Sequence, residues 1–176
     1  PLYQYQWHLN NTGQTNFATN AGTSGQDLNI DTDVSLGVDG DGVVIAVIDD
    51  GLELAHEDLA SNILTGYSWD YINLDTDPTP SSSSKSHGTS VAGIIAAEGW
   101  NNKGGRGVAP NAQLVGYNLL KAYTEANSAN AMYNTLAVNG DVDIFNMSYG
   151  PRTGVASKSY TRVRLTSLEE TALING

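Results

Sequence analysis

The chain has 176 residues, enough for one domain with a buried core, and its 19 acidic against 8 basic side chains give a formal charge of −11. This charge argues against a nucleic-acid binder, which would need a basic surface, and it is compatible with cationic partners or simply with solubility. The sequence has no cysteine and no apolar run of membrane-spanning length, which excludes disulfide bonds and argues against a membrane partner.

The N-terminal residues 1–27 are polar and aromatic, a composition that predicts an extended surface arm with Trp7 buried as its anchor. Asp27 is placed to cap a short helix over residues 28–36. After it we expect an αβ core that extends from residue 43 to residue 176.

Three apolar runs predict buried strands, at residues 43–49, 113–120 and 143–148. Helices are expected between and after them, at residues 87–99, 128–138 and 165–176. This alternation of strand and helix indicates an α/β fold with a parallel sheet and helices on its faces. A dinucleotide-binding fold is excluded, because Gly40 and Gly42 come before the first strand and no G-x-G-x-x-G follows it.

Two stretches bring acid–base side chains to the ends of predicted elements. Residues 43–51 (VVIAVIDDG) end on Asp49 and Asp50, at the carboxyl end of a strand, where open α/β sheets bind their ligands. His87 begins a helix of small residues that allow close packing. A histidine that accepts a proton and an aspartate that orients it are two members of a catalytic triad. A single aspartate at a strand end would more often be a turn residue, so the interpretation depends on both motifs together.

Four segments carry a family resemblance. Residues 47–59 (VIDDGLELAHEDL) resemble the aspartate motif of subtilisin-like serine proteases, in the kexin and furin version with two aspartates. Residues 87–93 (HGTSVAG) resemble the histidine motif of that family, and residues 146–151 (NMSYGP) resemble the segment that lines its substrate cleft. The opening residues 6–11 (QWHLNN) are also typical of the kexin-like branch. The resemblance covers essentially the whole chain, with the motifs in the family's order.

The resemblance implies a three-layer, subtilisin-like parallel sheet with helices on both faces, and a secreted endopeptidase that acts on peptides or proteins. It implies that Asp49 and His87 are catalytic. In the family's order, the oxyanion-hole asparagine and the nucleophilic serine follow the cleft-lining segment. We therefore expect residues 1–176 to be the N-terminal half of a catalytic domain, with a sheet that is incomplete at its C-terminal side and a C-terminal remainder as its partner.

Two serines compete for the role of nucleophile. Residues 88–92 (GTSVA) are similar to the family's nucleophile motif, but Ser90 follows His87 by three residues on the same helical turn. The triad histidine must face a serine from elsewhere in the fold, so we reject Ser90. Ser148 lies in the cleft-lining motif, where the family has a non-catalytic serine. A non-catalytic binding module that keeps the cleft of a protease therefore stays open as the alternative function.

The resemblance also implies substrate-binding roles for Asp50, Ser148, Tyr149 and Gly150. The charge of Asp50 would favour a basic residue just upstream of the scissile bond. Furin-like enzymes have acidic residues where this chain has Arg152 and Thr153, and another shortly before the histidine, where this chain has Ser84. These departures reduce the expected specificity to a mild preference for basic residues near the scissile bond.

Calcium is the expected cofactor, because hard cations bind clusters of carboxylate and carbonyl oxygens. The resemblance implies a first site formed by Asp58, Asn101 and the carbonyl groups of Glu98, Lys103 and Gly105. It implies a second site formed by Asp70, Asp75 and Asp77. The alternative interpretation of three acidic residues in one loop is a solvated turn.

Overall fold

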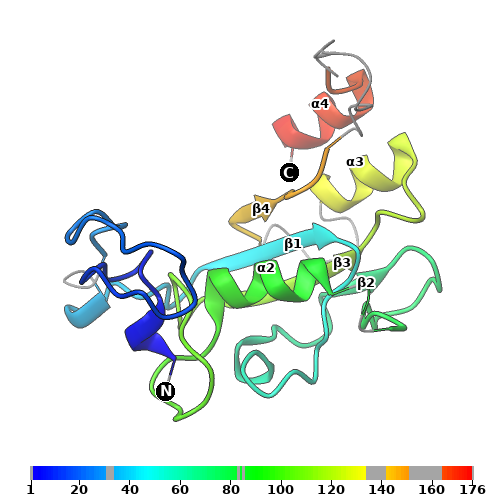
Figure 1. Ribbon diagram of the computed structural model, residues 1–176. Helices are drawn as coiled ribbons and strands as arrows, with labels where there is room; N and C mark the ends of the chain where they lie inside the picture. Colours follow the sequence, from blue (N-terminus) through cyan, green and yellow to red (C-terminus); the bar gives the residue numbers. More distant parts are fainter. Residues whose placement is uncertain are drawn as a thin grey trace.

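The computed structural model describes residues 2–30, 34–82, 84, 86–133, 142–150 and 164–175 (Figure 1). Its strands are β1 (Val44–Asp49), β2 (Trp69–Asp70), β3 (Gln113–Asn118) and β4 (Ile144–Asn146). Its helices are α2 (His87–Ala96), α3 (Glu125–Tyr133) and α4 (Ser167–Asn175), with short 3₁₀ turns η1 (Tyr3–Tyr5) and η2 (Ala60–Asn62). Within these described residues, no helix is both long and apolar enough to cross a membrane.

The strands form one parallel sheet in the order β2-β3-β1-β4. All six residues of β1 are buried, as expected for a strand covered on both faces. Asp49 at the end of β1 and Asp70 at the end of β2 are both in register with Asn118 of β3. The parallel α/β architecture that the apolar runs predict is therefore confirmed, and the carboxyl ends of three strands bring polar side chains to one edge.

Alternate residues of the strands contribute to two separate hydrophobic clusters, one on each face of the sheet. Ile45 and Val47 pack with small residues of α2 in one cluster. Val44, Ala46 and Ile48 pack on the other side, in a cluster that includes α3. Helix α4 packs against α3 in turn, so Figure 1 shows α2 on one side of the strands and the α3–α4 pair on the other. This arrangement is the expected layering of helices on both faces.

The small residues of α2 pack directly against the sheet. Ala92 and Ala96 are completely buried. A Cβ atom on Gly88 would collide with the backbone carbonyl of Gly51 and with the Asp49 side chain, so no larger residue fits there. The glycine after the histidine therefore sets the distance between the first turn of α2 and the end of β1.

The N-terminal arm lies on the surface as predicted, but its anchor is not Trp7. The Trp7 side chain is 55% exposed, whereas Leu9 is 1% exposed. The Gln6 side chain also accepts the N–H of Arg106 at 2.8 Å and donates to its carbonyl at 2.9 Å. The prediction of a buried Trp7 was wrong, because the arm is attached by hydrogen bonds between the Gln6 side chain and the Arg106 backbone and by the smaller apolar residue Leu9.

Several predicted boundaries also differ from the structure. The predicted helix over residues 28–36 is only partly observed: residues 34 and 35 are helical, and residues 31–33 lie outside the described residues. Residues 28–30 are not helical, because the Asp27 carboxylate accepts the N–H groups of Asn11 and Asn29 and forms a turn in which Asn29 has a φ of 55°. The predicted helix over 128–138 begins earlier, at Glu125, and its predicted end at residue 138 lies outside the described residues. The two-residue strand β2 was missed, since it is too short to show periodicity.

Candidate active site

The carboxyl end of β1 places Asp49 next to His87, the first residue of α2. Asp49 is completely buried, and each of its two carboxylate oxygens lies 2.9 Å from Nδ1 of His87. The same carboxylate accepts the backbone N–H of Asp50 at 2.7 Å, which fixes its orientation. The His87 side chain, in contrast, is 57% exposed. The site therefore presents an oriented imidazole to the solvent, with a buried acid behind it.

Asp49 changes the acid–base properties of this imidazole. Its hydrogen bond is the largest cause that raises the pKa of His87, followed by its charge, while desolvation opposes the shift and the Asp50 charge adds to it. Because Nδ1 of the neutral ring donates to Asp49, Nε2 is the unprotonated nitrogen. No described residue forms a hydrogen bond with Nε2. This arrangement can hold and transfer a proton at Nε2.

Asp50 connects the strand end to the helix and lines a separate hollow. Its carboxylate accepts the N–H of Gly88 at 2.9 Å, which satisfies one of the free donors at the N-terminus of α2. It also lines a hollow of about 230 Å³ together with Asp70 and Lys121. Asp50 is the partly exposed carboxylate of this hollow, because Asp70 is only 1% exposed.

The two candidate serines have other hydrogen-bond partners. The Ser90 hydroxyl donates to the backbone carbonyl of Ser86 at 2.8 Å, within its own helix. The Ser148 hydroxyl donates to the side-chain oxygen of Asn146 at 2.7 Å. Neither forms a hydrogen bond with His87.

The other predicted specificity residues are only partly described. Tyr149 is half-buried and Gly150 is exposed, both just after β4 at the edge of the sheet where Asp49 stands. Ser84 is exposed. Arg152 and Thr153 lie outside the described residues.

Four of the five residues of the first predicted calcium site, all except Gly105, are linked by hydrogen bonds. Asp58 is 7% exposed, and its carboxylate accepts the side-chain N–H of Asn101 at 2.7 Å. Its backbone carbonyl accepts the N–H of Glu98, and Lys103 donates its backbone N–H to the Asn101 oxygen. No basic side chain within the described ranges forms an ion pair with Asp58. A buried carboxylate without a cationic partner is costly, so this oxygen-rich environment fits a hard cation.

The residues of the second predicted site do not converge in this way. The buried Asp70 carboxylate accepts the backbone N–H groups of Ile72 and Asn73 and the side-chain amides of Asn73 and Asn118. Asp75 and Asp77 are exposed, and each accepts a backbone N–H from the residue two positions later. No group of three acidic, histidine or cysteine side chains within metal-binding reach is found among the described residues. This geometry is that of a hydrogen-bonded loop, and it does not fit a metal held by the three aspartates.

The comparisons with known proteins agree with this geometry. The sequence profile of the subtilase family matches residues 40–175. The chain belongs to the subtilase family. The extracellular serine protease of Aeromonas sobria is 44% identical over 152 residues, a match that covers 85% of this chain and 24% of that protein. Kexin of Saccharomyces cerevisiae is 38% identical over 153 residues, which cover 86% of this chain and 17% of kexin. These matches confirm the family that the sequence motifs predicted, and kexin is among the relatives of this chain.

The solved structures agree with the fold of this subtilase chain. The crystal structure of the Aeromonas sobria serine protease with its chaperone superposes with a TM-score of 0.80 at 42% sequence identity, over 87% of this chain and 26% of that one. The chain thus has a subtilisin-like fold, and it spans about a quarter or less of the length of the relatives named here.

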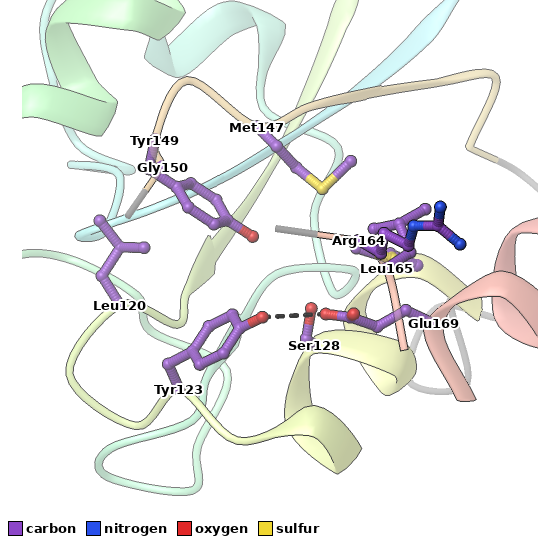
Figure 2. A pocket seen from close by; sticks show the side chains of 10 residues that line it. Leu120, Tyr123, Ser128, Met147, Tyr149, Gly150, Arg164, Leu165 and Glu169 are labelled. Atoms are coloured by element: carbon purple, nitrogen blue, oxygen red, sulfur yellow. Dashed lines mark hydrogen bonds between the residues drawn. The ribbon is translucent and has the colours of Figure 1, made fainter. Parts of the chain in front are cut away.

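The sequence motifs missed one cavity near this site. Figure 2 shows it between the segment after β4, the turn before α3 and the start of α4, with Tyr149, Tyr123 and Glu169 around it. Its volume is about 480 Å³. Since its lining comes from four separate segments, no local pattern in the sequence could have indicated it.

Proposed function

We propose that this chain is part of a serine endopeptidase, which hydrolyses peptide bonds with a triad of Asp49, His87 and a serine supplied by a part of the protein outside these 176 residues. The observation that carries the proposal is the buried Asp49 carboxylate, 2.9 Å from Nδ1 of an otherwise exposed His87. Membership of the subtilase family supports the same reaction.

In this proposal each residue of the pair has a separate task. Asp49 holds the imidazole in the tautomer that leaves Nε2 unprotonated, and it stabilises the imidazolium that forms. His87 accepts the proton of the serine hydroxyl at Nε2 as the serine attacks the carbonyl carbon. It then donates this proton to the leaving amine, so the histidine ends each half-reaction neutral.

The substrate preference is proposed to be mildly basic. The carboxylate of Asp50, which lines a hollow, offers negative charge to a Lys or Arg side chain near the scissile bond. Ser148, Tyr149 and Gly150 are proposed to line the cleft, a role supported by their place after β4 at the edge of the sheet that also carries Asp49. We further propose that the protein is secreted, since the Aeromonas relative is described as extracellular.

Calcium is proposed at the first site alone. The donors would be the Asp58 carboxylate, the Asn101 side chain and the carbonyl groups of Glu98, Lys103 and Gly105. The buried Asp58 has no ion-pair partner among the described residues, which supports this proposal, whereas the hydrogen bonds of Asp70 argue against the second site. A cation at Asp58 would stabilise the loops that carry these donors.

Expression of residues 1–176 alone and with the remainder of the natural protein tests the proposed function. The chain alone should not cleave peptides, because removing the serine costs about as much as removing the whole triad. The full-length protein should cleave them, and a serine-directed inhibitor should label a residue outside positions 1–176. Ser90→Ala is the control and should keep the activity of the parent.

Two outcomes would contradict the proposal. Cleavage by residues 1–176 alone that His87→Ala abolishes would place the nucleophile within this chain. A full-length protein that binds peptides and never cleaves them would establish the alternative, a binding module with the architecture of a protease.

A further inference from the structure

A short surface segment, residues 2–9 of the N-terminal arm, is attached to the loop of residues 104–106 (Figure 1, where the arm is blue). Leu2 donates its backbone N–H to this loop at 2.7 Å, and the Gln6 side chain forms two hydrogen bonds with the loop backbone, at 2.8 and 2.9 Å. Leu9 is the only fully buried residue of this described segment. A segment with so few buried apolar contacts can open locally while the sheet stays folded.

The imidazole of His8 belongs to this segment and is half-buried. Its Nε2 atom is buried and has no hydrogen-bond partner among the described residues. A neutral imidazole can leave Nε2 unprotonated, so that only a lone pair loses its solvent. The imidazolium has an N–H group at both ring nitrogens, so its formation would bury a donor without an acceptor. The closed arm therefore favours the neutral form of His8.

Arg106 adds a second cost to the protonation of His8. This arginine is only 4% exposed, and its guanidinium group lies 5.2 Å from the centre of the Tyr3 ring. Desolvation is the largest cause that lowers the pKa of His8 below its ordinary value, and the charge of Arg106 lowers it further. Protonation of His8 would thus place a second positive charge beside one that the arm already covers.

The other charged groups of the segments next to His8 have partners elsewhere. In the turn that contacts the His8 carbonyl, the Asp27 carboxylate accepts two backbone N–H groups. In the loop on the other side, Lys103 forms an ion pair with a different loop and Glu98 accepts a serine hydroxyl. Within the described part of the chain, Arg106 is thus the one charged group that acts on this imidazole.

We propose that His8 is an acid-sensitive switch, whose protonation releases residues 2–9 from the loop of residues 104–106. In the open arm the imidazole is solvated and separated from Arg106, so its pKa returns to the ordinary value of about 6.5. Acidification between about pH 8 and pH 5, the range in which histidine changes its charge, would therefore expose this loop. The inference does not depend on the proposed function, since it requires no peptide substrate.

The direction of the pH effect follows from proton linkage. The open arm binds the His8 proton more tightly than the closed arm, because the pKa of His8 is lowered in the closed arm. The stability that neutral His8 gives to the closed arm is fully present above about pH 6.5, the ordinary pKa. It is lost as the pH falls through the lower pKa of the closed arm.

Hydrogen exchange of the full-length protein at about pH 7.5 and about pH 5.5 tests the switch. The protection of the amides of residues 2–9, corrected for the intrinsic exchange rate at each pH, measures the opening of the arm. Opening should increase by about 3- to 10-fold at the lower pH, since one proton with a pKa of about 6.5 in the open arm allows at most about 10-fold over this range. The amides of β3 are the internal reference and should stay protected at both values.

Two histidine variants show whether His8 causes the change. His8→Phe keeps an aromatic ring and cannot be protonated, so its arm should have the same protection at both pH values. His56→Gln removes an exposed histidine and should behave like the parent. The melting temperature at about pH 7.5 checks that each variant folds, and His8→Gln, which is also uncharged, replaces His8→Phe if the larger ring does not fit.

NMR titration of the His8 imidazole provides an independent measurement. Its midpoint in the folded parent should lie below about 6.5, the ordinary pKa. A midpoint at or above that value would overturn the inference. Equal protection of the arm at both pH values, or a pH dependence that persists in the His8 variant, would also overturn it. None of these outcomes depends on whether the protein cleaves peptides.

Discussion

Asp49 and Asp70 are two buried carboxylates that end neighbouring parallel strands, on either side of Asn118, yet they have opposite environments. The Asp70 carboxylate accepts four N–H groups, all from its own loop and from Asn118. The Asp49 carboxylate contacts an imidazole that is 57% exposed. The same residue type at the same edge therefore stabilises a loop in one case and controls a reactive group in the other.

The comparison shows that burial alone does not identify a functional carboxylate. A carboxylate whose acceptor sites are all occupied by N–H groups of its own loop has none left for a substrate. A buried carboxylate that is hydrogen-bonded to an exposed imidazole instead changes the pKa of a side chain that a substrate can contact. Substitutions at the two positions should therefore separate activity from stability.

The largest expected effect is on activity, at Asp49. In the full-length protein, Asp49→Asn should lower kcat by about 10⁴-fold, because an amide at this position can hold the imidazole in the wrong tautomer. Its melting temperature should change much less than its activity. Equal kcat in Asp49→Asn and the parent, measured at saturating peptide, would remove Asp49 from the catalytic machinery.

The next largest effect is on stability, at Asp70. Asp70→Ala leaves several buried N–H groups without an acceptor and should lower the free energy of unfolding by roughly 3–5 kcal/mol. Asp75→Ala, at an exposed position of the same loop, is the control and should cost less than about 1 kcal/mol. Denaturant titration of the full-length protein measures both, and equal costs would contradict the role assigned to Asp70.

The contrast between the two aspartates also shows how far the sequence leads. The apolar runs predicted the parallel sheet, and the motifs around Asp49 and His87 predicted their proximity, because a strand end and a helix start are local features. The hydrogen bonds of Asp70 involve Asn118, 48 residues away, and could not be read from the spacing of acidic residues. The spacing of Asp70, Asp75 and Asp77 suggested a metal site because the sequence does not show that N–H groups already occupy the Asp70 carboxylate.

Asp58 offers a third kind of buried carboxylate, with one amide donor and no cationic partner in the described structure. If calcium binds there, a hundredfold excess over Kd should stabilise the full-length protein by about 2.7 kcal/mol. The melting temperature should therefore fall on addition of chelator in the parent and in Asp75→Asn. Asp58→Asn should lose this dependence. Loss in Asp75→Asn with retention in Asp58→Asn would instead favour the second site.

The smallest effect is the titration of His87 itself. Its pKa is raised mainly by the hydrogen bond and the charge of Asp49, so NMR of the imidazole should give a midpoint above the ordinary value of about 6.5 in the parent and a lower one in Asp49→Asn.

The sign of the accompanying stability effect follows from this shift. Because the folded-state pKa is above the unfolded one, the folded state binds the His87 proton more tightly. The stability that this proton adds is fully present below about pH 6.5 and is lost as the pH rises through the folded-state pKa. The advantage of the parent over His87→Gln in unfolding free energy should therefore shrink with rising pH, and it should remain small because the side chain is largely exposed. An advantage that grows with pH would mean that Asp49 does not stabilise the charged imidazole.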